Sequence, residues 1–136
     1  MSTRSNITIL LRPADRNKDF KTPWGQVVNA NGKKYLYIYC HYDGYPEGVG
    51  VDLIRMFDGN EYEKALKYIM LGDRSSTFLS YWDWREEQCA PRAADTVEEM
   101  YCNDYLYIIE EVDGTMQVRM YGDDYDEDSE DDGEED

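Results

Sequence analysis

The alternation of apolar side chains at two-residue spacing constrains the fold of this chain more than any other feature of its sequence. It occurs in residues 6–11 and 35–40, and again in residues 105–111 and 116–121. Successive side chains of a β-strand point to opposite faces of a sheet, so this period is typical of strands. An Asp-Gly dipeptide at 113–114 joins the last two segments and favours a two-residue hairpin turn. The sequence therefore predicts four strands, the last two of which form a hairpin.

Between residues 46 and 72 the apolar residues recur at the spacing of an α-helix. Pro46 suits the first turn of a helix, and the apolar residues that follow recur every three or four positions. These residues are Val49, Leu53, Met56 and Phe57 in a first helix, and Leu66, Ile69 and Met70 in a second. We expect Gly59 to end the first helix. The second should begin with a cap formed by Asn60 and Glu63 and end at Gly72.

These elements predict an α+β fold in the order ββααββ, with a four-stranded, mainly antiparallel sheet and two or three helices packed on one face. A chain of this length rarely divides its apolar residues between two cores, so we expect residues 1–121 to form a single domain. Residues 96–99 predict the start of a third, short helix, while residues 73–95 give no clear pattern. The segment 12–34 is expected to be a long loop with a hairpin-like tip at the Asn-Gly pair 31–32.

Within the predicted strands, the alternation separates aliphatic from tyrosine side chains. One face would carry Leu36, Ile38, Leu106 and Ile108, and the other Tyr35, Tyr37, Tyr39, Tyr105 and Tyr107. If the helices cover the aliphatic face, the tyrosines either form a second small core or remain open as an interaction face. In the first case the cover would come from the 12–34 loop and from a segment that contains Trp82 and Trp84.

Negative charge is concentrated in residues 122–136. The whole chain has a formal net charge of -16, and this segment holds 11 of its 30 acidic residues and none of its 14 basic ones. Residues 1–121 therefore carry 19 acidic and 14 basic residues, a net charge of -5. The segment has no aliphatic side chain to offset the entropy cost of ordering, so we expect a disordered acidic tail. It is either a solvated, solubilising segment or a mimic of nucleic-acid charge that engages a basic groove on another protein.

The remaining composition disfavours several classes of function. No cluster of Lys and Arg supports direct binding of nucleic acid. Cys40, Cys89 and Cys102 form an odd number without the spacing of a zinc site, which favours a reducing compartment. No run approaches the roughly 20 apolar residues of a membrane helix, and the first residues do not resemble a signal peptide. We therefore expect a protein of the host cytoplasm without a cofactor, metal or membrane contact, and the sequence leaves its oligomeric state open.

The most distinctive motif is Tyr-Cys-His-Tyr-Asp-Gly-Tyr-Pro-Glu-Gly-Val-Gly at residues 39–50. Together with Ser-Thr-Arg-Ser-Asn-Ile at residues 2–7, it resembles a family of small uncharacterised proteins from bacteriophages, prophages and their bacterial hosts. Those proteins typically begin S-T-R-x-x-I and carry H-x-D-G-Y-P-E-G after the second strand. The resemblance covers about the first 57 residues. It implies a phage or mobile-element setting, but no established activity and no catalytic residue.

The same motif supplies a candidate ligand-binding cluster, whose members are Arg4, His41, Asp43, Tyr45 and Glu47. We expect Arg4 to pair with a carboxylate of this cluster at the end of the sheet. A catalytic pair of Cys40 and His41 is disfavoured, because adjacent strand residues point to opposite faces. Residues 48–50 lack the third glycine of a phosphate-binding loop, which argues against nucleotide binding. In the alternative interpretation, the motif serves only to form a turn and start a helix.

Two functional hypotheses from different classes follow. The first is a non-catalytic phage or mobile-element accessory protein that binds a host protein, such as a defence nuclease, through a tyrosine-rich, acidic surface. The second is a small enzyme or ligand-binding domain centred on Arg4, His41, Asp43 and Glu47. A concave site with converging polar groups around His41 favours the second hypothesis, whereas a flat tyrosine face favours the first. We prefer the binding hypothesis over the enzyme.

Overall fold

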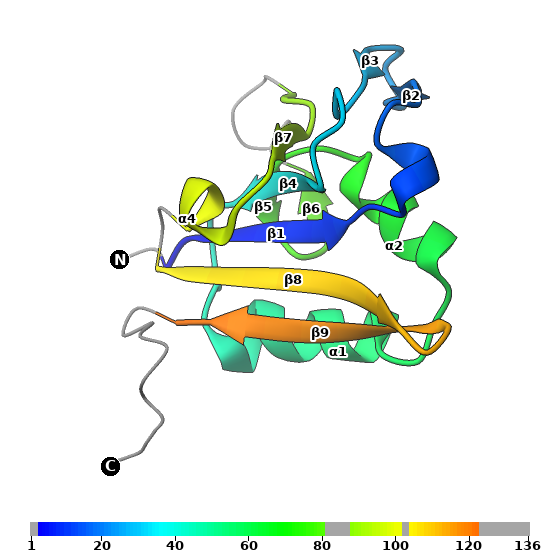
Figure 1. Cartoon of the computed structure of the whole chain (residues 1–136). Helices are drawn as coiled ribbons and strands as arrows, with labels where there is room; N and C mark the ends of the chain where they lie inside the picture. The colour runs from blue at the N-terminus through cyan, green and yellow to red at the C-terminus, as the bar shows by residue number, and fades with distance from the viewer. Residues whose placement is uncertain (1–2, 81–87, 102–103, 123–136) are drawn as a thin grey trace.

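A seven-stranded mixed sheet forms the centre of the computed structural model, which describes residues 3–80, 88–101 and 104–122 (Figure 1). The strands are β1 (Ser5–Leu10), β4 (Tyr35–Cys40), β5 (Arg74–Ser76), β6 (Leu79–Ser80), β7 (Arg92–Ala94), β8 (Tyr105–Val112) and β9 (Thr115–Tyr121). Hydrogen-bonded neighbours follow the order β6-β5-β4-β1-β8-β9, and β7 pairs with β4 as well. The first strand of the chain therefore lies in the middle of the sheet.

The pairing of β1 with its two neighbours sets which side chains share a face. β1 runs antiparallel to β4, with Ile7 opposite Ile38. On its other side β1 runs parallel to β8, with Ile7 opposite Tyr107. Residues that face one another across strands point to the same side of the sheet. Ile7, Ile38 and Tyr107 therefore lie on one face.

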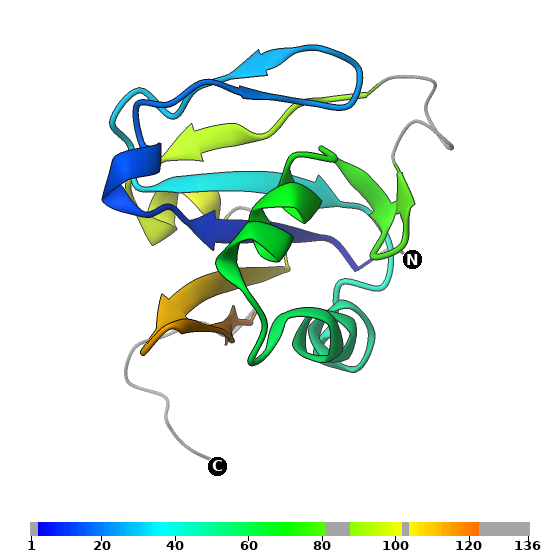
Figure 2. The same cartoon turned by 90° about the vertical axis from the view of Figure 1, so that its right-hand side faces the viewer.

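Helices cover the two faces unequally. The turn of π-helix η2 (Pro46–Gly50) leads directly into α1 (Val51–Phe57), and α2 (Tyr62–Ile69) follows after a short loop. These helices lie on one side of the sheet, whereas α4 (Val97–Met100) lies on the other, as the two views show (Figures 1 and 2). A single turn of 3-10 helix, η1 (Pro13–Asp15), follows β1.

The cores on the two faces differ in size. The larger core joins β1, β4 and β8 to α1 and α2, and its fully buried members include Ile7, Ile9, Leu36, Ile38, Leu53 and Ile69. The smaller core lies on the opposite face beneath α4 and β7, and is built by Ala94, Met100, Leu106 and Ile108. Both faces of β1 and β8 are thus buried, as is usual for strands at the centre of a mixed sheet.

The predicted α+β class and the four predicted strands are confirmed, but the predicted four-stranded ββααββ sheet is wrong in its detail. β5, β6 and β7 add strands that the sequence did not predict, and the contact between β1 and β8 is parallel. Strands of two or three residues are too short to show a period of two, which explains why residues 73–95 gave no pattern. The hairpin turn at Asp113 and Gly114 is confirmed, with both residues at positive φ.

The prediction of one tyrosine face is also wrong. Tyr105 and Tyr107 point to the face covered by α1 and α2, because β8 places Tyr107 opposite Ile7. The register of β4 and β8 against β1 places the other three tyrosines on the opposite face, together with Leu106 and Ile108. These tyrosines are Tyr35, Tyr37 and Tyr39. Alternation within each strand was correct. The relative register of β4 and β8 could not be inferred from it, and a shift of one residue exchanges the faces.

Smaller corrections concern a helix cap and the long loop. α2 is capped at Glu61 without a side-chain hydrogen bond, and Asn60 instead donates from Nδ2 to the Met56 carbonyl at 2.7 Å. The 12–34 loop contains a small hairpin of β2 (Phe20–Lys21) and β3 (Val27–Val28), so its tip lies before the predicted Asn-Gly pair. That pair does form a turn, in which Lys33 donates to Ala30. Trp82, Trp84 and the acidic tail lie outside the described residues.

Candidate functional site

The sequence stretches 2–7 and 39–50, on which the expected family resemblance rests, contact each other directly. The amide of Gly44 donates to the carbonyl oxygen of Thr3 at 2.9 Å. A Cβ atom on Gly44 would lie 2.8 Å from that oxygen, so a side chain at this position would push the two segments apart. On the other side, the hydroxyl of Tyr107 donates to the Gly44 carbonyl at 2.6 Å. The turn after β4 is thus fastened both to the start of β1 and to β8.

A second constraint within the motif fixes the start of η2. Asp43 has a positive φ of 59°, and its carbonyl accepts a hydrogen bond from Val49 at 2.8 Å. The same carbonyl would lie 2.4 Å from a Cβ atom on Gly48. Tyr45 is extended, as the residue before a proline must be, and Pro46 then begins the helix. These contacts account for the Asp-Gly-Tyr-Pro-Glu-Gly order by turn geometry.

His41 lies at the end of β4, where its ring contacts two tyrosines. Its Nδ1 atom lies 2.6 Å from the Tyr39 hydroxyl, and its ring meets that of Tyr42 edge to face with centroids 4.6 Å apart. The neighbouring Cys40 is fully buried, and this burial raises the pKa of its thiol to about 12. A buried thiol that stays protonated is a poor nucleophile, which argues further against a catalytic pair of Cys40 and His41.

The five residues of the candidate ligand cluster are neighbours but do not converge on one point. Arg4 uses its backbone amide to bind Asp104 at 3.1 Å, and it forms no ion pair with any described residue. Its predicted pairing with a carboxylate of the motif is therefore not observed among those residues. Tyr45 donates to Asp43 at 3.3 Å, while Glu47 lies on η2 beside β9. Within the described segments, no three His, Cys, Asp or Glu side chains gather closely enough to hold a metal ion.

The tyrosines of the predicted interaction face also lie apart. Tyr107 is 1% exposed and belongs to the larger core, with the ring of Tyr105 stacked at a centroid distance of 6.4 Å. Tyr35 and Tyr37 pack beside the smaller core on the opposite face. Tyr39 is half-buried and is hydrogen-bonded to His41. The five rings therefore form no continuous platform.

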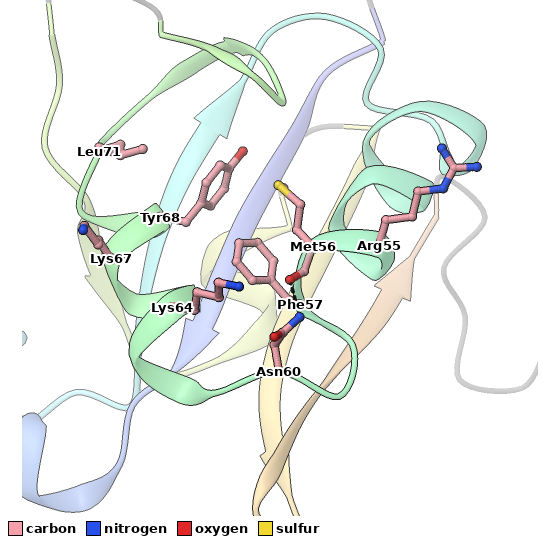
Figure 3. A pocket seen from close by; sticks show the side chains of 8 residues that line it. All are labelled: Arg55, Met56, Phe57, Asn60, Lys64, Lys67, Tyr68 and Leu71. Carbon is pink, nitrogen blue, oxygen red and sulfur yellow. Dashed lines mark hydrogen bonds between the residues drawn. The ribbon is translucent and has the colours of Figure 1, made fainter.

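A groove between α1 and α2 has the composition of a binding site (Figure 3). It encloses about 450 Å³ and is lined by Arg55, Met56, Phe57, Asn60, Lys64, Lys67, Tyr68 and Leu71. We call it the basic groove, since its lining contains three cations and no acidic residue. Sequence analysis did not identify it, because its cations come from two helices and are not consecutive in the chain.

Aromatic and apolar side chains form the floor of the basic groove. The rings of Phe57 and Tyr68 meet at a centroid distance of 5.3 Å, and both residues are buried. The Tyr68 hydroxyl donates to the Thr77 carbonyl at 2.9 Å, and burial raises the pKa of this phenol. At the end of the groove nearest the loop between α1 and α2, Asn60 of that loop donates a hydrogen bond to the Met56 carbonyl of α1. The floor is therefore held in place from both ends.

The cations of the basic groove have no carboxylate partner within the described part of the chain. The ion pairs formed there join Arg12 to Glu63 and Glu111, Arg92 to Asp73, and Arg119 to Glu110. Lys64 and Lys67 are exposed on α2, and Figure 3 shows Lys64 directed toward Phe57. Arg55 is exposed on α1, and its guanidinium extends away from α2 in the same view. These side chains are available to an anionic group that approaches the groove.

A second, apolar groove of about 340 Å³ runs between α1 and the outer strand β9. Its exposed apolar members are Ile54 and Met120, at 50% and 49% exposure, and Val118 of β9 also lines it. Among the described strands, none pairs with the outer edge of β9. This groove offers apolar contact area, but it has no cluster of polar groups that would orient a small ligand.

Comparison with known proteins gives no relative from which a function could be transferred. No protein-family model, curated protein or solved structure matches this chain. In the segments that the structure describes, every helix is too short or too polar to cross a membrane. The function must therefore be argued from the geometry of the two grooves and of the motif.

Proposed function

We propose that this chain is a non-catalytic accessory protein that acts by binding another protein, with the basic groove as the contact site. The observation that carries the proposal is the set of three cations around an aromatic floor, none of which is paired with a described carboxylate. In a chain with a formal net charge of -16, basic residues are scarce and carboxylates are abundant. Three unpaired cations beside one groove favour an anionic ligand there.

The preferred ligand is a short acidic segment of a partner protein. Carboxylates of such a segment would bind Lys64 and Lys67, with Arg55 at the far edge of the groove. An apolar side chain would contact Met56 and Leu71, the half-buried members of the lining. A nucleic acid fits less well, because its continuous charge needs many cations and would be repelled by the rest of this acidic chain. A protein segment brings few charges and can supply apolar contacts as well.

The biological setting of the proposal rests on the resemblance of residues 2–7 and 39–50 to phage and prophage proteins. In that setting the partner is a host protein, and a defence nuclease remains our candidate. The contact surface differs from the one expected from sequence, since the tyrosines are divided between two faces. A domain centred on Arg4, His41, Asp43 and Glu47 is not our preferred proposal, because these side chains do not converge on one point.

A charge-reversal pair tests the proposal. The full chain is immobilised, partners are captured from host extract, and the bound proteins are identified by mass spectrometry. We expect a partner that is retained by the native chain and lost with K64E/K67E, because two attractive charges of the groove become repulsive. The control K33E/K34E changes the net charge equally at exposed positions outside the groove, and should retain the partner. Equal retention by both variants, or equal loss, contradicts the proposal.

A further inference from the structure

We infer that the acidic tail of the same chain, residues 123–136, occupies the basic groove and competes there with the partner. This inference rests on the proposed function, because it names a regulator of the same groove. In this inference the tail inhibits the groove of its own chain, and a partner binds only when it displaces the tail. Two features of the molecule support it: charge and reach.

Charge complementarity is the first feature. Eleven of the residues 123–136 are Asp or Glu and none is basic. Of the cations in residues 1–121, Arg12, Arg92 and Arg119 are already paired with carboxylates, whereas Arg55, Lys64 and Lys67 have no carboxylate partner among the described residues. The last three share one groove. The tail would therefore meet clustered counter-charge at that site.

α1 separates the end of β9 from the basic groove. β9 ends at Tyr121, and its residue Met120 lies in the same surface groove as Ile54 of α1. Arg55, the next residue of α1, already belongs to the basic groove. At the other end of β9, Met116 exchanges hydrogen bonds with Gly59 and Asn60, at 2.9 and 3.1 Å. α1 thus forms a wall shared by β9 and by the groove.

The tail is long enough to follow this wall. An extended chain covers about 3.3 Å per residue, so residues 123–136 span roughly 46 Å. The seven residues of α1 span only about 10 Å at the rise of an α-helix. The tail can therefore leave β9, pass Arg55 and reach Lys64 and Lys67 on α2 without stretching.

Tethering makes even a weak contact effective. A segment joined by a short linker has an effective concentration of about 1 mM, so a tail with a dissociation constant of about 100 micromolar would fill the groove about nine-tenths of the time. A partner segment then binds about tenfold more weakly to the native chain than to one with a neutral tail. Salt should reduce this difference, because it screens exposed charges.

Zero-length cross-linking of the full chain tests the contact itself. A carbodiimide joins a carboxylate to a lysine amine only when the two are in contact, and mass spectrometry identifies the pair. We expect tail carboxylates to be joined to Lys64 and Lys67 at low salt, far more than to Lys33 and Lys34, with loss of these products at 1 M salt. A mixture of 14N- and 15N-labelled chains separates intramolecular from intermolecular products. Even distribution over the four lysines, or products only between chains, contradicts the inference.

A binding measurement tests the competition. The probe is a synthetic peptide with the sequence of residues 123–136, added to the native chain and to a full-length chain in which the eleven tail acids are replaced by Asn or Gln. We expect about tenfold tighter binding to the neutral-tail chain, and loss of that binding when K64Q/K67Q is added. Equal affinity for the native and neutral-tail chains contradicts the competition. Circular dichroism of each variant confirms that the comparison is between folded proteins.

The two proposals fail in different ways. If the captured partner is lost with K64E/K67E but the tail gives no cross-links to Lys64 and Lys67, the tail inference is wrong and the proposed function stands. If the cross-links form but the captured partner is retained by K64E/K67E, the tail contact stands, and both the proposed function and the competition are wrong. Agreement of both experiments supports an autoinhibited groove.

Discussion

At the scale of single residues, the turn between β4 and α1 depends on atoms that approach each other too closely to admit a side chain. Gly44 lies against Thr3, Gly48 against the Asp43 carbonyl and Gly50 against the ring of Tyr107. The first two neighbours are backbone, which cannot move without distorting the turn. The third is a ring atom 3.2 Å away, so a movement of a few tenths of an ångström would relieve the contact. The three positions should therefore tolerate a methyl group to different degrees.

Replacement of Gly48 by Ala should destabilise the fold by about 2–4 kcal/mol, because the new Cβ would lie 2.4 Å from the Asp43 carbonyl oxygen. Gly50→Ala should cost less than about 1 kcal/mol, since its Cβ would lie 3.2 Å from a ring atom of Tyr107. Urea unfolding of both variants measures the difference. Similar losses for the two would show that the close approach at Gly48 is relieved by backbone movement.

The hydroxyl of Tyr107 provides a second test at this scale. Tyr107→Phe removes the 2.6 Å hydrogen bond to the Gly44 carbonyl in a buried site, so we expect a loss of about 1–2 kcal/mol in the free energy of unfolding. The matched control is Tyr45→Phe, which removes an exposed hydrogen bond to Asp43 and should change stability by less than about 0.5 kcal/mol. An equal effect of both substitutions would contradict the role assigned to Tyr107.

At the scale of elements, sequence patterns predicted the strands that show a regular alternation. They failed where the structure depends on which strands pair and which helices pack together. The long strands β1, β4, β8 and β9 were found because each alternates over at least six residues. β5, β6 and β7 were missed because they are too short to alternate. The tyrosine face was wrong because β8 pairs in parallel with β1, and nothing within a strand reports its register against a neighbour. The basic groove was missed for a related reason, since the approach of α1 to α2 is a tertiary feature.

The short helix α4 was predicted in part, because Thr96 and Glu99 have the spacing of a capping box. The box is present: Glu99 donates from its backbone to the Thr96 side chain at 3.2 Å, and its carboxylate accepts from the Thr96 amide at 3.0 Å. These contacts also lower the pKa of Glu99, chiefly through the amides of Asp95 and Thr96. A four-residue helix has little other local support.

Replacement of Thr96 by Ala should therefore cost about 1 kcal/mol, within the range seen for lost helix caps. Hydrogen exchange at the amides of residues 97–101 should accelerate more than at those of β1, because α4 opens locally. Thr115→Ala, at an exposed position in β9, is the control and should leave these exchange rates unchanged. Equal exchange rates in the native and T96A proteins would contradict the importance of the cap.

At the scale of the whole molecule, the larger core contains several groups that can ionise only at high pH. Burial raises the pKa of the Cys40 thiol to about 12, and it also raises the pKa values of Tyr62, Tyr68 and Tyr107 above that of an ordinary phenol. In the unfolded chain these groups lose their protons near pH 8.5 for cysteine and near pH 10 for tyrosine. The unfolded state therefore binds fewer protons than the folded state in alkaline solution.

Stability should consequently be fully retained below about pH 8 and fall as the pH rises from about 9 to 12. We expect the Cys40 thiol to contribute a loss on the order of 3 kcal/mol between pH 8 and pH 11, and the three tyrosines to add to it above about pH 10, measured by urea unfolding at each pH. Cys40→Ala should reduce the slope of this loss, although packing at neutral pH would be weaker. A urea midpoint that stays constant up to pH 11 would show that these groups are not shielded from water.

The central place of β1 also determines when the molecule can fold. Residue 5 pairs with residue 105, so the contact between β1 and β8 closes a loop of about 100 residues. Contacts between such distant positions slow folding, since the entropy of closing the loop is lost before the contact forms. During synthesis at about 5–20 residues per second, β1 emerges several seconds before β8. Until then the edge of β1 that pairs with β8 remains unpaired. The sheet is therefore completed only after β8 has left the ribosome. A nascent chain is most prone to aggregate in this interval, because the unpaired edge can bind another chain.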